Sequence, residues 1–302
     1  MAHEQRVGLF YTWLAMTGYA VLPVLVKQIQ ALGMLPLDIA IWRFVFAVPS
    51  FWLVIYARRM PTPARPLPRL HLLGLGVLLA GAAITAFFGL ERVPASTYIF
   101  LFYTYPAMVA LLSLLFGERL PLQGWVALAL TLTGIALTAP DFAAGLASES
   151  LPGVVLALLN ALLVAVYFIF NSRVLRGHTA LAQGSAWAIT GALLVMLAIM
   201  PFNGLALPAQ PETWGLLLLL ALFCTVMPVF ALTIGIQKLG ASRSAIISTV
   251  EPIMTLVLAA AILGERMQPV QLVGGALIIA SVVLLQMRPV HRRQASALVS
   301  GD

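Results

Sequence analysis

Charged residues and cysteine are both scarce in this chain. Only 9% of its 302 residues are charged and 62% are hydrophobic, whereas soluble proteins have about 25% charged residues. A soluble domain of this length could not bury so large an apolar fraction, which excludes that class and indicates a membrane protein. The single cysteine, Cys224, excludes a disulfide within the chain, and its apolar surroundings predict a buried structural thiol.

Motifs for catalysis, nucleotides and metals are also missing. The sequence has no HExxH, GxSxG or P-loop pattern and no histidine–cysteine cluster with metal-ligand spacing. Its four histidines, His3, His71, His178 and His291, lie at chain ends or in loops. We therefore predict that the protein is not an enzyme and holds no cofactor or metal. Without a nucleotide site, any transport has to draw on a gradient or on exchange.

Ten apolar stretches take up most of the chain. A transmembrane helix needs about 20 apolar residues to cross a hydrocarbon core of about 30 Å. The predicted fold class is therefore an all-α polytopic membrane protein with ten transmembrane helices. These spans run roughly over residues 8–28, 36–57, 70–90, 94–116, 121–139, 152–171, 181–202, 213–236, 241–263 and 268–287.

The basic residues outside these spans are divided unevenly between alternate loops. Thirteen lie on one predicted side of the membrane and three on the other. By the positive-inside rule this bias places both termini in the cytoplasm of a multi-pass inner-membrane protein. It also accounts for the net charge of +7 without a nucleic-acid partner. The larger group is Arg6, Arg58, Arg59, Arg65, Arg69, Arg119, Arg173, Arg176, Lys238, Arg243, Arg288, Arg292 and Arg293, and the smaller is Lys27, Arg92 and Arg266.

The second half of the chain repeats a pattern of the first. Residues 95–119 align with residues 241–266, because each segment opens on Ala-Ser, contains a proline and closes on Gly-Glu-Arg. Pro106 matches Pro252 in this alignment. The predicted units are a first five-helix repeat over 1–140, a connecting loop over 141–150, a second five-helix repeat over 151–290 and a cytoplasmic tail over 291–302.

Five helices per repeat is an odd number, so the second copy enters the membrane from the opposite side. This predicts an inverted repeat, in which the binding site lies near the midplane between the two copies. The Gly-Glu-Arg triplets then fall on opposite sides, with Glu118-Arg119 cytoplasmic and Glu265-Arg266 external. We interpret each Glu-Arg pair as an ion pair at a helix end, with direct contact to a ligand as the alternative.

The paired pattern resembles the drug/metabolite transporter superfamily, and in particular its EamA-like ten-helix members. Trp42-Arg43-Phe44 is similar to the Arg-Phe of that family's second helix, and Glu251-Pro252 to the Glu-Pro of its ninth. The resemblance covers nearly the whole chain. It implies a 5+5 helix bundle, alternating access and export of small metabolites, with the YddG-type amino-acid exporters as a comparison. Tyr105-Pro106 stands in the first half where the second has Glu251-Pro252, so a mechanism that needs an acid in both halves is not implied.

Glu251 is an acid predicted to lie near the centre of the membrane. It is about ten residues into the span over 241–263, which is about 15 Å at 1.5 Å per residue. An ionised group at that depth has to face the interior, take a partner or be protonated. Pro252 has no backbone N–H, which frees the carbonyl of Ser248. The acid and this carbonyl suit an ammonium group, a proton or a cationic substrate, and the alternative is a structural ion pair with Arg43.

Arg43 lies about five to seven residues inside the span over 36–57. One interpretation is a long side chain that extends toward the nearer membrane interface. The other is an anchor that pairs with Glu251 or meets a substrate carboxylate.

Aromatic and polar side chains at helical spacing complete the predicted site. Tyr98, Phe102 and Tyr105 share one face of their span, and Asn160 and Tyr167 share one face of another. Helix packing and interhelical hydrogen bonds are the alternatives for these residues. The predicted substrate-binding residues are Glu251, Arg43, Tyr98, Phe102, Tyr105, Trp42, Tyr19, Asn160, Tyr167 and Ser248.

Prolines fall inside several of the predicted spans. A proline removes a helical hydrogen bond, and membrane proteins tolerate the loss where the broken helix is buried or lines a cavity. We therefore predict gating hinges at Pro23, Pro106, Pro228 and Pro252.

Together these features predict a secondary active transporter that exports small metabolites by alternating access around a central cavity. Amino acids, including aromatic ones, are the first choice of substrate. An exporter of cationic or aromatic drugs would use the same acid and aromatic wall, and a membrane receptor or sensor is the non-transport alternative. The expected partners are a small-molecule substrate and the lipid bilayer. We expect a monomer, with a dimer as the alternative.

Overall fold

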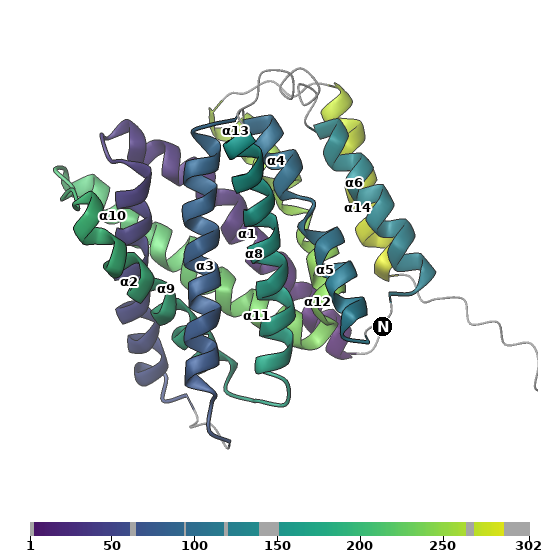
Figure 1. Ribbon diagram of the computed structural model, residues 1–302, viewed down its shortest axis with the longest axis horizontal. Coiled ribbons are helices and arrows are strands. Elements are labelled where there is room, and N and C mark those ends of the chain that lie inside the picture. The colour runs from purple at the N-terminus through teal and green to yellow at the C-terminus, as the bar shows by residue number, and fades with distance from the viewer. Residues whose placement is uncertain are drawn as a thin grey trace, which may run out of the picture.

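The computed structural model of the chain is a bundle of helices packed side by side (Figure 1). It describes residues 3–60, 65–93, 95–117, 120–138, 151–263 and 269–286. Every regular element within these ranges is helical. Four features predicted from the sequence lie outside the described residues, namely the Glu-Arg pairs at 118–119 and 265–266, the join over 141–150 and the tail over 291–302.

Each of the ten predicted spans corresponds to one helix or to a helix that is interrupted along its length. Seven are single helices: α1 (His3–Ala31), α2 (Pro36–Ala57), α3 (Arg69–Leu90), α6 (Leu122–Thr138), α8 (Leu151–Val174), α9 (Leu181–Asn203) and α14 (Pro269–Gln286). The fourth span consists of α4 (Ala95–Phe102) and α5 (Tyr105–Leu115). The eighth consists of α10 (Pro211–Ala221), the π-helix η1 (Leu222–Val226) and α11 (Met227–Leu239), and the ninth of α12 (Ala241–Ser248) and α13 (Glu251–Leu263).

Length and composition indicate which elements are able to cross a membrane. Within the described residues, six helical runs are long and apolar enough to do so: α1, α2, α3, α8, α9 and the run from α10 to α11. Shorter apolar stretches lie in α5, α6 and α14. Leu115, Leu194 and Phe202 are large apolar side chains that remain exposed on the outside of the bundle, as expected of a surface that meets lipid. The predicted all-helical, polytopic membrane fold is confirmed.

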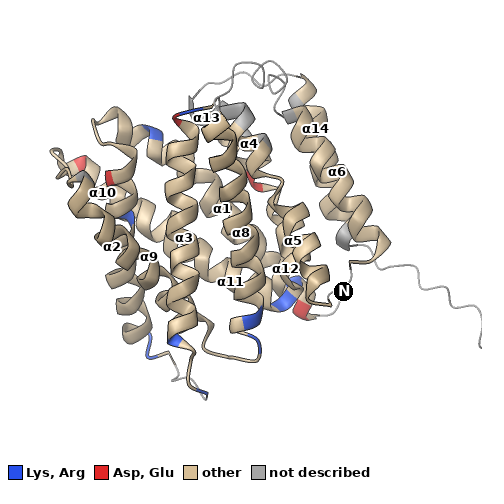
Figure 2. Cartoon of the chain, viewed as in Figure 1, with Lys and Arg blue, Asp and Glu red and all other residues tan. Residues whose placement is uncertain are grey.

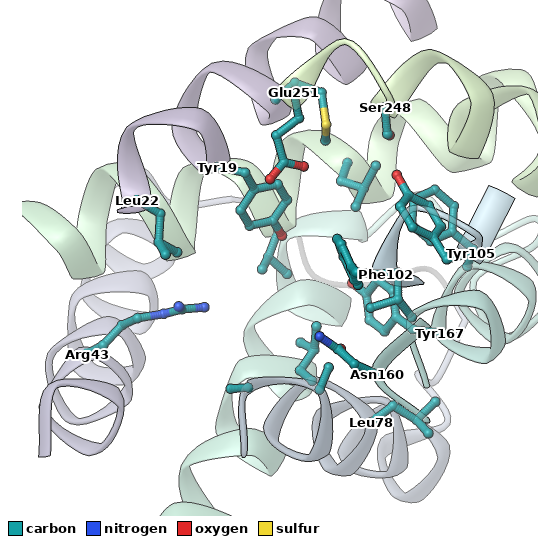
Figure 3. Close-up of a pocket in the computed structure, with 18 of the residues that line it drawn as sticks. Tyr19, Leu22, Arg43, Leu78, Phe102, Tyr105, Asn160, Tyr167, Ser248 and Glu251 are labelled. Carbon is teal, nitrogen blue, oxygen red and sulfur yellow. The ribbon is translucent and has the colours of Figure 1, made fainter. Parts of the chain in front are cut away.

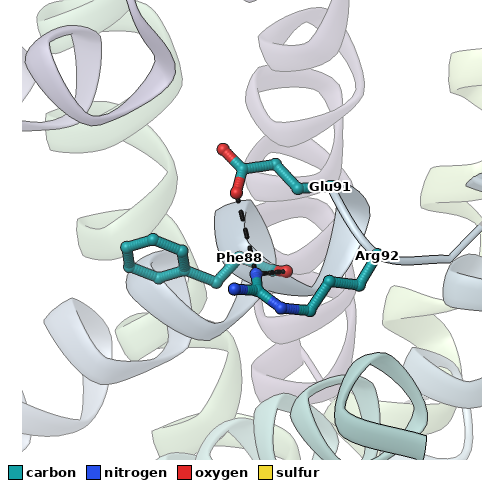
Figure 4. Close-up of polar contacts among 3 residues, drawn as sticks. All are labelled: Phe88, Glu91 and Arg92. Atoms are coloured by element: carbon teal, nitrogen blue, oxygen red, sulfur yellow. Dashed lines mark hydrogen bonds and ion pairs between the residues drawn. The ribbon is translucent and has the colours of Figure 1, made fainter. Parts of the chain in front are cut away.

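Charged side chains lie mainly at the ends of the helices (Figure 2). Lys and Arg gather at the lower end of the bundle in this view; Arg69 begins α3 and Lys238 lies in the last turn of α11. At the far end of α3, Arg92 donates a hydrogen bond of 2.6 Å to the carbonyl of Phe88 and lies 3.7 Å from the Glu91 carboxylate (Figure 4). The uneven distribution of positive charge agrees with the sequence, and the side that faces the cytoplasm stays a prediction.

The helices of the two halves pack in one pattern that occurs twice. α1 packs along α11 and α8 packs along α3, so the first helix of each half lies against the third of the other. α4 and α5 contact α8, just as α12 and α13 contact α1. α6 packs on α14 at one edge of the bundle (Figure 1). The sequence repeat is therefore also a repeat of contacts, and the interior is shared between the halves.

Glycines allow the backbones of α3 and α9 to touch. A methyl group on Gly76 would lie 2.2 Å from the carbonyl oxygen of Ala188, and one on Gly191 would lie 2.3 Å from the carbonyl oxygen of Leu73. Both oxygens belong to the backbone, so neither can rotate away. Close approach at small residues is a main source of helix association in lipid, where apolar burial supplies little driving force.

Replacing Gly76 with alanine is expected to destabilise the fold by about 1–3 kcal/mol, because the added methyl group forces α3 and α9 apart. Gly74→Ala is the matched control on the same helix, since nothing lies within 4 Å of the group it adds. Its higher helix propensity should leave stability unchanged or slightly raised. Thermal unfolding in detergent measures both variants, and equal midpoints would contradict the backbone contact.

Candidate functional site

A cavity of about 190 Å³ lies between the two halves of the bundle (Figure 3). Side chains from α1, α2, α3, α4 and α5 line it on the side of the first half, and side chains from α8, α11, α12 and α13 on the side of the second. Most of the residues that line the cavity are apolar, including Met16, Phe44 and Phe168. Eight of the ten predicted substrate-binding residues line this cavity: Tyr19, Arg43, Phe102, Tyr105, Asn160, Tyr167, Ser248 and Glu251.

Two interrupted helices meet at the cavity, and after each break a proline is the second residue of the next helix segment. α4 and α5 are separated at Tyr103-Thr104, ahead of Pro106, and α12 and α13 are separated at Thr249-Val250, ahead of Pro252. A proline has no N–H to donate to the helix, and its ring clashes with the preceding turn. The prolines matched in the sequence repeat therefore produce matched breaks in the fold.

Threonine side chains satisfy backbone carbonyls at both breaks. The hydroxyl of Thr104 donates to the carbonyl of Leu101, and the hydroxyl of Thr249 donates to the carbonyl of Ile246, each at 2.6 Å. Carbonyl groups without a partner are costly in a membrane interior. These local bonds stabilise each interruption without a contact from another helix.

Glu251 is the first residue of α13, and its carboxylate points into the cavity (Figure 3). The hydroxyl of Tyr103, which lies in the break between α4 and α5, is close enough to interact with this carboxylate. One side-chain contact thus joins the two breaks. Sequence reasoning did not select Tyr103, because in a continuous helix it lies off the face of Tyr98, Phe102 and Tyr105. The break changes its direction.

Arg43 points into the cavity from a different wall (Figure 3). Among the described residues its guanidinium has no ion pair, and its buried Nε has no hydrogen-bond partner. The Cζ atom lies 5.1 Å from the centre of the Phe44 ring, within the range of a cation–π contact. The structural ion pair between Arg43 and Glu251 is therefore not formed in this structure. In Figure 3, Tyr19 lies between the two charged groups.

Two asparagines of α8 make buried hydrogen bonds near the cavity. Asn160 donates from Nδ2 to the hydroxyl of Tyr98, so Tyr98 contacts a lining residue without lining the cavity itself. Asn171 donates from Nδ2 to the hydroxyls of Tyr167 and Thr233, at 3.2 and 3.1 Å. Sequence reasoning did not select Asn171 and Thr233. A lone amide in an apolar span, four residues from a tyrosine, is the signal that could have found the first of them.

Aromatic rings form a continuous wall on one side of the cavity. The ring centres of Phe102 and Tyr105 are 5.3 Å apart, and those of Tyr105 and Phe168 are 5.7 Å apart. Tyr98 stacks on Phe102 with ring centres 6.4 Å apart. The predicted shared face of Tyr98, Phe102 and Tyr105 thus persists across the helix break. Aromatic contacts of this kind give the wall a fixed shape.

Trp42 lies apart from the cavity lining. Its Nε1 donates to the carbonyl of Ala206 at 2.9 Å, and its ring centre is 5.0 Å from that of Trp214. Trp42 therefore joins α2 to α10 and the segment before it, although it is next to Arg43 in the sequence.

The four predicted hinges differ in their surroundings. Pro106 and Pro252 are each the second residue after a helix break, and Pro228 is the second residue after the π-helix η1. Pro23 lies inside α1, which continues through it. Three of the four positions thus coincide with a local departure from regular α-helix.

The cavity offers a guanidinium, a carboxylate, hydroxyl groups and an amide on a largely apolar wall. In the part of the chain that the structure describes, no group of three or more His, Cys, Asp or Glu side chains is placed to hold a metal ion. The arrangement suits reversible binding of a small molecule that has both polar and apolar parts.

Comparison with known proteins identifies the family. The sequence profile of the EamA-like transporter family matches residues 6–139 and again residues 151–287. The uncharacterized transporter YcbK of Bacillus subtilis is 26% identical over 280 residues, which are 90% of this chain and 90% of that protein. The uncharacterized transporter sll1319 of Synechocystis is 32% identical over 222 residues, which are 72% of this chain and 67% of that protein.

Two further similarities concern export and fold. The threonine/homoserine exporter RhtA of Escherichia coli is 28% identical over 219 residues, which are 71% of this chain and 70% of that protein. A solved crystal structure matches 93% of this chain and 96% of its own with a TM-score of 0.79, at 19% sequence identity. This last similarity concerns the fold alone.

Cysteine labelling is expected to show that the cavity is reached by water. Ala82 lines the cavity, so Ala82→Cys should react with a charged methanethiosulfonate reagent in intact membranes. The native Cys224 is buried and should not react in the unmodified protein. Leu194→Cys is the matched control on the outer face of α9, where Leu194 is 53% exposed. Labelling of Ala82→Cys no faster than Leu194→Cys would contradict an aqueous cavity.

Proposed function

The chain belongs to the EamA-like transporter family, and from this membership we propose a secondary active transporter that exports amino acids, including aromatic ones. The observation that supports this most directly is the pair of Arg43 and Glu251, which face one cavity from different walls and do not pair with each other. An amino acid carries a carboxylate and an ammonium group close together. The two side chains match these groups in sign.

Each charged side chain has a distinct role in this proposal. The guanidinium of Arg43 binds the substrate carboxylate, for which its planar donor geometry is suited. The carboxylate of Glu251 accepts hydrogen bonds from the substrate ammonium group, and Tyr103 lies close to that carboxylate. Because the surroundings are largely apolar, each contact is stronger than it would be in water.

The size and walls of the cavity favour a small metabolite. At about 190 Å³ it is smaller than the roughly 300–1,000 Å³ typical of sites for drug-sized ligands. The rings of Phe102, Tyr105 and Phe168 offer an apolar aromatic surface to the substrate side chain. RhtA, a relative that exports threonine and homoserine, supports amino acids as the substrate class.

We propose alternating access as the transport mechanism. The two halves share the cavity and repeat one set of contacts, as expected for an inverted repeat that rocks between two compartments. The breaks before Pro106 and Pro252, together with η1 before Pro228, supply points where helix segments can change angle. The sequence has no P-loop, so the energy comes from a gradient or from exchange.

Export of cationic drugs is the second candidate, because Glu251 and the aromatic wall would also suit an organic cation. Arg43 argues against it, since a second cation in the same small cavity would meet an unpaired guanidinium. The same residue therefore separates the two candidates.

Purified protein in liposomes is expected to move a labelled amino acid without ATP, with a rate that depends on pH. Glu251→Gln should lower that rate more than about tenfold, because the substrate ammonium group loses a desolvated charged partner. The same change should flatten the pH dependence of the rate, because it removes a titrating group. Glu4→Gln is the matched control, since Glu4 pairs with Lys238 at the surface. An unchanged rate and pH profile in Glu251→Gln would contradict the role of Glu251.

Removing the guanidinium is expected to change the charge preference of the cavity. In the unmodified protein a small quaternary ammonium compound should compete poorly against the labelled amino acid. Arg43→Met should lose amino-acid flux and bind the quaternary ammonium compound at least about tenfold more tightly, because a repulsive charge is removed. Arg92→Met, outside the cavity at the end of α3, is the control. Strong competition by the cation in the unmodified protein would favour the drug exporter.

A further inference from the structure

Asn160 lines the cavity and has a side-chain hydrogen-bond acceptor without a partner in the described part of the chain. The residue lines the cavity and is only 4% exposed. Its Nδ2 donates to the hydroxyl of Tyr98, while its Oδ1 has no hydrogen-bond partner within the described residues. A buried acceptor without a partner is unfavourable, and such a group in a binding cavity points to a donor on the ligand.

Packing around Tyr98 fixes the orientation of this amide. The ring of Tyr98 is 4% exposed and lies on Gly89, where an added methyl group would be 2.5 Å from the Tyr98 Cε2 atom. The ring also stacks on Phe102 at an interplanar angle of 13°. Tyr98 is therefore held between α3 and α8, and its hydroxyl accepts the hydrogen bond that fixes Nδ2 of Asn160.

Asn171 shows what a purely structural amide looks like in the same helix. It is 1% exposed and its Oδ1 is also without a partner, but it does not line the cavity. Its Nδ2 bonds two hydroxyls, those of Tyr167 and Thr233, which tie α8 to α11. Asn160 differs because its side chain lines the cavity where a substrate would lie.

The placement of Asn160 indicates which part of a substrate it meets. In Figure 3, Arg43, Glu251 and Asn160 lie on three different sides of the cavity. A substrate whose carboxylate meets Arg43 and whose ammonium group meets Glu251 directs its side chain toward the third side. The donor that reaches Asn160 therefore belongs to the side chain of the amino acid.

We propose that Asn160 sets side-chain specificity, by accepting a hydrogen bond from a hydroxyl or N–H group on the side chain of the transported amino acid. The transporter then prefers such an amino acid over an isostere without the donor, because the isostere leaves the amide oxygen unpaired. Tyr98 acts as a positioning residue that orients the amide. This inference rests on the proposed function and narrows its substrate class.

Two isosteric pairs test the specificity in proteoliposomes. Uptake of tyrosine is compared with phenylalanine, and uptake of threonine with valine, as ratios of kcat/KM. The unmodified protein should favour the hydroxylated member of at least one pair by about tenfold or more. Asn160→Leu, which keeps the volume and removes the acceptor, should bring that ratio to about 1 by reducing the hydroxylated substrate alone.

Tyr98→Phe provides a second variant that keeps the ring on Gly89 and removes only the hydroxyl. It should lower the same ratio by about threefold, because the amide is no longer held. If Asn160→Leu does not fold, this variant decides the question. A ratio near 1 in the unmodified protein, or a ratio unchanged in both variants, would overturn the proposal.

Asn171→Leu is the matched control for a lost buried amide. Asn171→Leu should lower the unfolding temperature and leave the substrate ratio unchanged. If Asn171→Leu loses the ratio as fully as Asn160→Leu does, Asn160 acts only through the fold and the proposal is overturned. Failure of the unmodified protein to move any amino acid would instead contradict the proposed function. Amino-acid flux without discrimination within either pair would leave the proposed function intact and overturn the role of Asn160.

Discussion

Arg43 and Glu251 place a guanidinium and an acid inside an apolar bundle without pairing them to each other. Ionisable groups at this depth are unfavourable unless they face a partner or an aqueous space, and here both face one cavity. Several features of the fold serve this arrangement. The break ahead of Pro252 makes Glu251 the first residue of a helix segment, the break ahead of Pro106 brings Tyr103 to its carboxylate, and α2 brings Arg43 from a separate wall.

The two halves contribute to this cavity by the same packing but with different chemistry. The first helix of each half lies against the third helix of the other, and each half has a helix broken before a proline. The residue that opens the second segment is Tyr105 in one half and Glu251 in the other. Duplication thus explains the shared helix breaks. Divergence at this single position places an acid on one side of the cavity and adds Tyr105 to the aromatic wall on the other. A site with one acid and one guanidinium suits a zwitterion better than a symmetric pair of acids would.

Much of the fold could be predicted from the sequence because lipid imposes a simple rule on it: each span is a long apolar run, and all ten correspond to helical segments in the structure. The breaks at the matched prolines were also visible, whereas Pro23 shows that a proline alone does not end a helix. Tyr103 could not be found by helical periodicity, because the break alters its direction. Trp42 illustrates the opposite case, since its partners at Ala206 and Trp214 are remote in sequence. Both depend on contacts between distant segments, which periodicity does not encode.

The proposed recognition requires that one cavity binds the carboxylate and the ammonium group of the same molecule. Thermal stabilisation of the purified protein tests it with three forms of one amino acid: the free zwitterion, the N-acetyl derivative, which lacks the ammonium charge, and the amide, which lacks the carboxylate. This recognition predicts that the zwitterion raises the unfolding temperature and that neither derivative does so at the same concentration. Stabilisation by the amide as large as that by the zwitterion would contradict it, because Arg43 would then have no part in recognition.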